Sequence, residues 1–224
     1  MPRIYFYKLT ADNGGAPCVQ DGLLSLAICK PMIRTTAELE DVIFGFAANS
    51  LHRDNRLIYI ARIGKKVCNG DYYREKRFAN RGDCVYEWHR SRVAWRHGAL
   101  HHGPKDLVHD LGHPPHYKKA NVLLSTDFRY FGASGTADYK SRFQLVKKAV
   151  EQLGRGHRVT HSEPLRMELK ALKQHAWENN PKRVAGEPTS APRPGVCHRS
   201  SSCGVLVNSD DDDVRAGKWA EQLN

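Results

Sequence analysis

The feature that most constrains this fold is a set of three short apolar runs in the first 63 residues. Successive side chains of residues 3–9 would alternate between the two faces of a strand. Val42–Ala47 and residues 56–63 are rich in Ile, Val, Phe and Tyr. Such runs between polar or Gly-rich segments are typical of strands. The sequence therefore predicts a β-rich N-terminal half, and Gly45 predicts a bulge where the sheet curls.

Shorter segments extend this expected sheet. Residues 23–29 indicate a strand that ends before Pro31, and a helical turn is predicted from Thr35 with Thr36 as its cap. The segments CVYEW, RVAW and NVLLS predict three more strands. Residues 126–135 (TDFRYFGASG) instead predict a turn-rich segment with exposed aromatic rings.

Two amphipathic helices are expected at residues 139–153 and 163–179, where apolar side chains recur at three- and four-residue spacings. After them the composition changes to Pro, Ser and a run of four Asp, which favours disorder. The sequence thus predicts one α+β domain at residues 1–184 and a disordered tail at residues 185–224. The domain would hold a curled mixed or antiparallel sheet, or a small barrel, with two C-terminal helices.

The charge is concentrated in that domain. Residues 1–184 carry 31 Lys or Arg against 18 Asp or Glu, while residues 185–224 carry 4 against 6. A basic body favours a phosphate-bearing partner, DNA or a nucleotide first and RNA second. No apolar run is long enough to span a membrane and no signal-peptide pattern is present, so we expect a cytoplasmic protein without a membrane partner. The six cysteines are widely spaced and are interpreted as buried thiols.

A family resemblance lies in residues 28–66. The segments ICKPMIR, AELEDVIFGFAANS and RLIYIARI resemble the nucleotide modification associated domain family of the second type, and STDFRYFG resembles its closing strand and turn. The resemblance covers residues 3–135 and implies a domain linked by gene context to DNA base modification. One departure is Glu40-Asp41, where the family usually has Gly-Asp. The same hairpin is similar, more distantly, to PUA-like and EVE-like barrels, which bind RNA or extruded modified bases.

A base-handling protein needs groups that meet the base and groups that hold phosphate. Asp127 follows a predicted strand and is the leading candidate for a catalytic or base-reading carboxylate, with His109 or Asp110 as its partner. Cationic side chains can bind the phosphates, and an aromatic ring can stack on the base. The candidates for phosphate or nucleic-acid binding are Lys30, Arg34, Tyr130, Lys147 and Lys148. Such a protein would act as a reader or as a component of a modification pathway, and the sequence leaves open whether it is an enzyme.

Residues 107–117 (LVHDLGHPPHY) support an alternative. They are similar to the motif of HD-domain deoxynucleotide triphosphohydrolases, which implies a divalent metal held by His109, Asp110 and His113 and a metal-dependent nucleotide phosphohydrolase. That chemistry needs a helical bundle, whereas the flanking segments predict strands. A solvated loop around a short helix is the simpler interpretation. A second alternative is a non-catalytic adaptor for another protein.

Overall fold

The computed structural model describes residues 1–189, which form an α+β fold with three sheets and five α-helices. The sheets are mixed or antiparallel, and none of those in the described residues closes into a barrel. The predicted curled mixed or antiparallel sheet is therefore confirmed, and the PUA-like barrel is wrong. No helix within residues 1–189 has the length and apolar character needed to cross a membrane.

The central sheet has the order β10-β5-β4-β1-β11. Its strands are β1 (Ile4–Leu9), β4 (Val42–Ala47), β5 (Leu57–Arg62), β10 (Asp127–Tyr130) and β11 (His157–Arg158). β1 and β4 are parallel, and the other neighbours are antiparallel. The register between β4 and β5 shifts at Gly45/Phe46, which is the position where the sequence predicts an irregularity of the strand. A side chain at Gly45 would collide with the ring of Tyr59, so the bend requires glycine.

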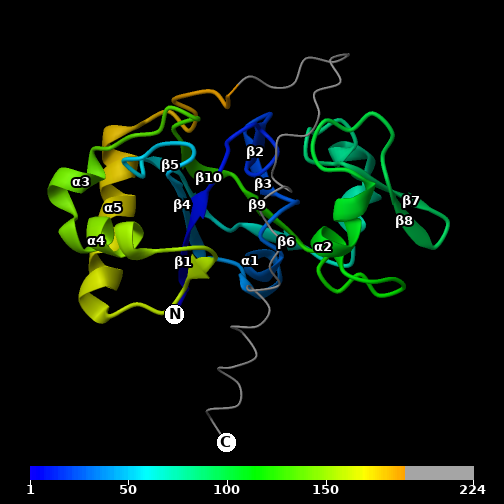
Figure 1. The fold of residues 1–224 in the computed structure, drawn as a ribbon, viewed down its shortest axis with the longest axis horizontal. Coiled ribbons are helices and arrows are strands. Elements are labelled where there is room, and N and C mark those ends of the chain that lie inside the picture. Colours follow the sequence, from blue (N-terminus) through cyan, green and yellow to red (C-terminus); the bar gives the residue numbers. More distant parts are fainter. Residues whose placement is uncertain (190–224) are drawn as a thin grey trace, which may run out of the picture.

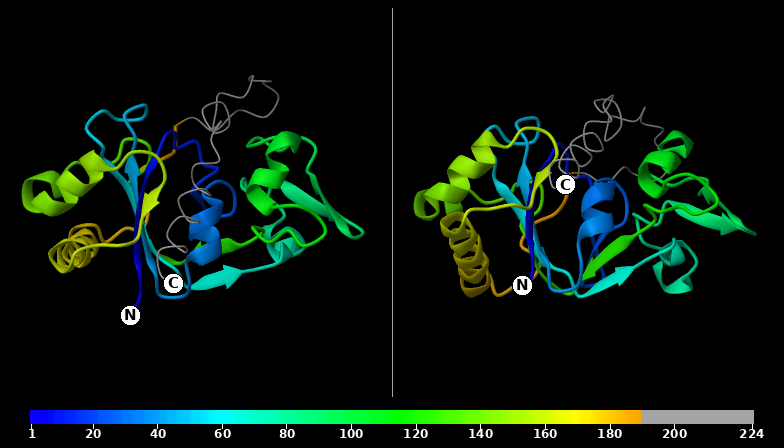
Figure 2. Two further views of the ribbon diagram at one scale, coloured as in Figure 1. Left: turned by 60° about the horizontal axis from the view of Figure 1, so that its bottom comes forward. Right: turned by 90° about the horizontal axis from the view of Figure 1, so that it is seen from below.

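Alternating side chains give this sheet two buried faces. Phe6, Phe44 and Ile60 pack against the helices α3 (Tyr139–Arg142), α4 (Gln144–Gln152) and α5 (Glu163–Asn179). Tyr7 and Tyr59 lie on the opposite face, toward α1 (Pro31–Thr36). Figure 2 shows the sheet edge-on between these two layers.

A second antiparallel sheet, of order β2-β3-β9-β6, leads away from the central sheet. Its strands are β2 (Cys18–Gln20), β3 (Leu23–Leu26), β6 (Lys65–Val67) and β9 (Val122–Ser125). Residues 68–121, which we call the second lobe, connect β6 to β9 and have an aromatic core of their own. The lobe contains the 3₁₀ helices η1 (Asp71–Tyr73), η2 (Lys76–Phe78) and η3 (Pro104–Asp106), the hairpin β7 (Tyr86–His89) and β8 (Arg92–Trp95), and α2 (Leu107–Leu111). It lies at the opposite end of the molecule from α3–α5 (Figure 1).

Two local predictions are wrong. The first helix begins at Pro31 and ends at Thr36, because proline fits the first helical position and the left-handed residues Cys29 and Lys30 turn the chain ahead of it. Residues 127–130 form strand β10 rather than a turn. The rings of Phe128, Tyr130 and Phe131 are buried because pairing with β5 turns them into the two cores.

The described chain continues past residue 184 in hydrogen-bonded form. The N–H of Ala185 donates to the backbone carbonyl of Tyr130, and the N–H of Ala133 donates to the backbone carbonyl of Glu187. Gly132 and Gly186 allow these backbones to pass close to one another. Residues 185–189 of the predicted tail are thus packed on the domain, and residues 190–224 lie outside the described residues.

Candidate functional site

Arg34 of α1 is fully buried, and its guanidinium is surrounded by backbone oxygens. Nε donates to the carbonyl of Cys29 at 2.7 Å, and Nη2 donates to the carbonyl of Asp110 at 2.6 Å. Nη1 donates to the carbonyls of Lys119 and Asn121 at 2.9 and 2.6 Å. The donors of Arg34 therefore join α1 to α2 and the end of the second lobe, an arrangement that does not favour the predicted phosphate contact.

The carboxylate of Asp110 is the acceptor at the middle of this cluster. Oδ1 accepts the N–H of Cys29 at 3.0 Å and lies 4.0 Å from Nη2 of Arg34. Oδ2 accepts the hydroxyl of Tyr86 at 2.7 Å and lies 2.6 Å from Nδ1 of His102. Burial alone would raise the pKa of Asp110, but the hydrogen bonds from His102 and Tyr86 and the charge of Arg34 lower it. The group is thus an ionised acceptor, which places the proton of His102 on Nδ1.

The other ring nitrogen of His102 faces a thiol. Nε2 lies 3.2 Å from Sγ of Cys29, a half-buried residue between β3 and α1. We call Cys29, His102 and Asp110 the Cys29 triad. Since Nδ1 carries its proton toward Asp110, Nε2 offers a lone pair to the S–H group. Such a chain can move a proton from sulfur to imidazole.

The backbone at this site is strained. Cys29, Lys30 and His102 have φ of 58, 42 and 54°, in the left-handed region that costs L residues about 1–3 kcal/mol each. Asp110 binds the N–H of Cys29 and Arg34 binds its carbonyl, so the buried ion pair holds both ends of the strained cysteine. Lys30 is half-buried beside it, with Nζ 5.3 Å from the ring centre of Tyr7.

A groove of about 720 Å³ lies on the other side of α2, between β8 and residues 114–117. It is lined by Arg92, Val93, Leu107, Val108, Pro115 and Tyr117, together with neighbouring residues. The lining is mainly apolar, and Arg92 is the charged side chain in it. Val108 and His109 are exposed on α2, whereas Asp110 and Leu111 point into the protein. The same five-residue helix therefore borders the groove and the Cys29 triad.

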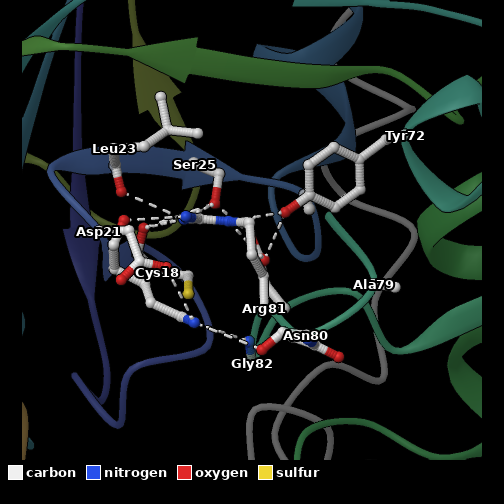
Figure 3. Close-up of polar contacts among 12 residues, drawn as sticks. Cys18, Asp21, Leu23, Ser25, Tyr72, Ala79, Asn80, Arg81 and Gly82 are labelled. Atoms are coloured by element: carbon white, nitrogen blue, oxygen red, sulfur yellow. Dashed lines mark hydrogen bonds and ion pairs between the residues drawn. The ribbon is translucent and has the colours of Figure 1, made fainter. Parts of the chain in front are cut away.

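The second lobe holds another buried ion pair, Arg81–Asp83, and Figure 3 shows the side chain of Arg81 beside Ser25, Leu23 and Tyr72. Asp83 accepts the hydroxyls of Ser25 and Tyr72 at 2.5 and 2.6 Å. Arg81 donates to Ser25 Oγ, to Tyr72 Oη and to the carbonyls of Cys18, Gln20 and Leu23. The hydrogen bonds of this pair are made with buried hydroxyls and with strand carbonyls, and they join the lobe to β2 and β3.

The histidines of the predicted metal site are not brought together with Asp110. His109 and His113 are exposed, while Asp110 is buried against Arg34, Tyr86 and His102. In the part of the chain that the structure describes, no group of three or more His, Cys, Asp or Glu could hold a metal ion. The geometry gives no support to a metal site of His109, Asp110 and His113.

Asp127 lies at the edge of the central sheet. Its carboxylate accepts Nε of Arg62 at 2.6 Å and Nε1 of Trp177 at 2.8 Å. Partial burial would raise the pKa of Asp127, but these hydrogen bonds and the charges of Lys173 and Arg62 lower it. The group links β10 to β5 and α5, and its hydrogen bonds are not with His109 or Asp110.

The remaining candidates are dispersed. Tyr130 is buried and donates its hydroxyl to Asp12 at 2.7 Å, so its ring is not available for stacking on a base. Lys147 and Lys148 lie on α4, at the far end of the molecule from the second lobe (Figures 1 and 2). Lys30 follows Cys29 directly and is a half-buried predicted cation beside the Cys29 triad.

Sequence reasoning missed Cys29 and His102. The sequence predicts Cys29 as one of the buried thiols and places His102 in a solvated, histidine-rich segment that precedes residues 107–117. One local signal was available: a cysteine at the end of an apolar run, directly before Lys-Pro, marks the junction of a strand and a helix. Its partner was not visible, because 73 residues separate Cys29 from His102.

A family model described as nucleotide modification associated domain 2 matches residues 1–191. No curated protein and no solved structure gives a significant match to the chain.

Proposed function

The chain belongs to the nucleotide modification associated domain 2 family, and from this membership we propose that it binds a nucleotide or a nucleic-acid strand and handles one of its bases. It would act as a reader or as a component of a modification pathway. The ligand we favour is single-stranded DNA, with RNA and free nucleotides as related ligands.

The observation that carries this proposal is the groove between β8 and α2. Its apolar floor suits the faces of unstacked bases and sugars, and Arg92 at its side suits a phosphate. The surrounding second lobe has ten Lys or Arg against six Asp or Glu, and seven of the twelve histidines. A paired duplex hides its bases, so this combination favours a single strand.

The Cys29 triad is the place where a base from that strand would arrive. α2 contributes Val108 to the groove and Asp110 to the triad, so both features share one short helix. Lys30 stands next to Cys29 and supplies a cation for the phosphate of that nucleotide. In this proposal the groove holds the strand and the triad meets the base.

Fluorescence anisotropy with a labelled single-stranded 20-mer tests the proposal. We expect binding that falls steeply between 50 and 200 mM salt, because phosphate contacts release counterions. Arg92→Glu with Lys118→Glu, the exposed lysine directly after the groove residue Tyr117, should weaken binding at least tenfold. Lys147→Glu with Lys148→Glu is the matched control, since it changes the charge equally at the opposite end of the molecule. The absence of salt-sensitive binding to DNA, RNA or nucleotides, or equal losses in the two variants, would contradict the proposal.

A further inference from the structure

We infer that Cys29 is a catalytic nucleophile: His102 takes the proton of its thiol, and the sulfur adds to C6 of a pyrimidine base. The choice of base rests on the proposed function, whereas the nucleophile itself rests on the geometry of the triad.

The hydrogen-bond chain has the order that an activated thiol requires. Oδ2 of Asp110 lies 2.6 Å from Nδ1 of His102, and Nε2 lies 3.2 Å from Sγ of Cys29. The thiol of Cys29, the imidazole that can accept its proton and the carboxylate that orients the imidazole therefore follow one another at hydrogen-bonding distances. Tyr86 donates to the same oxygen of Asp110 at 2.7 Å and fixes the carboxylate in that orientation.

The surroundings hold this thiol in place at a cost in stability. Cys29 and His102 both have left-handed backbones, and a structural thiol would not require either. The strain is maintained by Arg34 and Asp110, which bind the carbonyl and the N–H of Cys29. Two other cysteines show the contrast: Cys18 and Cys84 are buried, and burial raises the pKa of their thiols to about 12 and about 11.

The same contacts decide which reaction the thiol can perform. Acyl transfer needs N–H donors for an oxyanion beside the nucleophile, and the N–H of the nucleophilic residue itself is a common donor. That N–H is already bound to Asp110 at 3.0 Å. Addition to a conjugated carbon has no such need, because the ring delocalises the charge. In a strand-binding protein of this family, C6 of a pyrimidine is the carbon of that kind.

The step balances without a further reactant. The thiol proton passes to Nε2 of His102, an Sγ–C6 bond forms, and the electron pair of the C5=C6 double bond moves to C5. The imidazolium then returns the proton to C5, which gives net addition of S–H across C5=C6. Reversal removes a hydrogen from C5 and restores the base and the thiol. Repeated cycles in D₂O therefore replace the hydrogen at C5 with deuterium.

Loss of the H5 proton signal in D₂O, measured by NMR on single strands of deoxycytidine or deoxyuridine, tests this inference. We expect the full-length protein to exchange H5, Cys29→Ala and Cys29→Ser to abolish exchange, and His102→Gln to slow it about 10²–10⁴-fold. Cys68→Ala, a half-buried cysteine outside the triad, should exchange at the wild-type rate.

Anisotropy binding of the same strands keeps the two proposals separate. Strands that bind without exchanging H5, or exchange that persists in both Cys29 variants, would overturn the nucleophile inference and leave the proposed function standing. If neither strand binds, the proposed function fails. Exchange that depends on Cys29 at high strand concentration would still support the nucleophile in that case.

Discussion

The two buried arginine–aspartate pairs of this protein differ in the groups to which they are hydrogen-bonded. The hydrogen bonds of Arg81–Asp83 are made with the hydroxyls of Ser25 and Tyr72 and with strand carbonyls, and those with Ser25, Cys18 and Leu23 tie the second lobe to β2 and β3. Arg34–Asp110 also ties elements together, but its carboxylate continues to His102 and the thiol of Cys29.

This difference shows that burial of an ion pair does not identify a functional site. Both pairs pay for desolvation, and such pairs seldom add net stability compared with apolar residues of similar size. The Arg81–Asp83 pair specifies how two elements join. The Arg34–Asp110 pair does this too, and it also holds a strained cysteine against an imidazole. A carboxylate that orients a histidine beside a thiol is the feature that separates them.

The largest effect is expected at the structural pair. Arg81→Ala leaves the carboxylate of Asp83 buried without its cation, so the free energy of unfolding should fall by about 3–5 kcal/mol. Urea denaturation followed by circular dichroism measures this. Arg77→Ala removes an exposed pair with Glu75 and should change stability by less than about 1 kcal/mol. Equal losses of unfolding free energy in the two variants would mean that the buried pair contributes no more to stability than the exposed pair.

Matched asparagine variants separate the roles of the two carboxylates. Asp110→Asn keeps the volume but no longer holds the proton of His102 on Nδ1, so alkylation of Cys29 by iodoacetamide at pH 7 should slow about 10²-fold or more. Asp83→Asn should lower stability and leave the alkylation rate of Cys29 unchanged. Peptide mass spectrometry gives both rates. An unchanged rate in Asp110→Asn would remove Asp110 from the proposed relay.

A third buried carboxylate, Asp12, extends the comparison to pH. Its side chain is buried, and Oδ2 accepts the hydroxyl of Tyr130 at 2.7 Å. Burial raises the pKa of Asp12 to about 6 from an ordinary 3.8. The folded state then binds this proton more tightly than the unfolded chain does, so the contribution of Asp12 to stability falls as pH rises from about 4 to about 6.

Asp12→Asn cannot ionise and tests this sign. Relative to the wild type, the variant should gain up to about 2 kcal/mol of unfolding free energy between pH 4 and pH 7. Urea titrations at the two pH values provide the measurement. A difference between the proteins that does not change with pH would show that Asp12 is already ionised at pH 4.

The smallest effect is expected at Asp127, which sequence reasoning favoured as the catalytic carboxylate. It is a partly exposed acceptor for Arg62 and Trp177, so Asp127→Asn should cost about 1 kcal/mol or less. Deuterium exchange at H5 should match the wild type. Loss of exchange with unchanged strand binding would move the reactive site from Asp110 to Asp127.

The local elements were predictable where one pattern dominated. β1, β4, β5 and α5 follow from alternating or helical apolar spacings within a few residues. β10 was not predictable, because the burial of Phe128 and Tyr130 depends on a partner strand about 70 residues away. The candidate site has the same limit. The sequence makes Asp110 a candidate partner of Asp127 or, in the alternative, a metal ligand. Its contacts with Cys29 and His102 were not predictable, because they arise only from the packing of α1, α2 and the loop before η3.

The pH dependence of alkylation at Cys29 tests the central claim most directly. If His102 accepts the thiol proton, Cys29 of the wild type should still react with iodoacetamide near pH 6, whereas in His102→Gln the reaction should require a pH above about 8. Cys68 in the same samples provides the internal control. Profiles for Cys29 that coincide in the two proteins would contradict the account, because the thiol would then titrate independently of the imidazole.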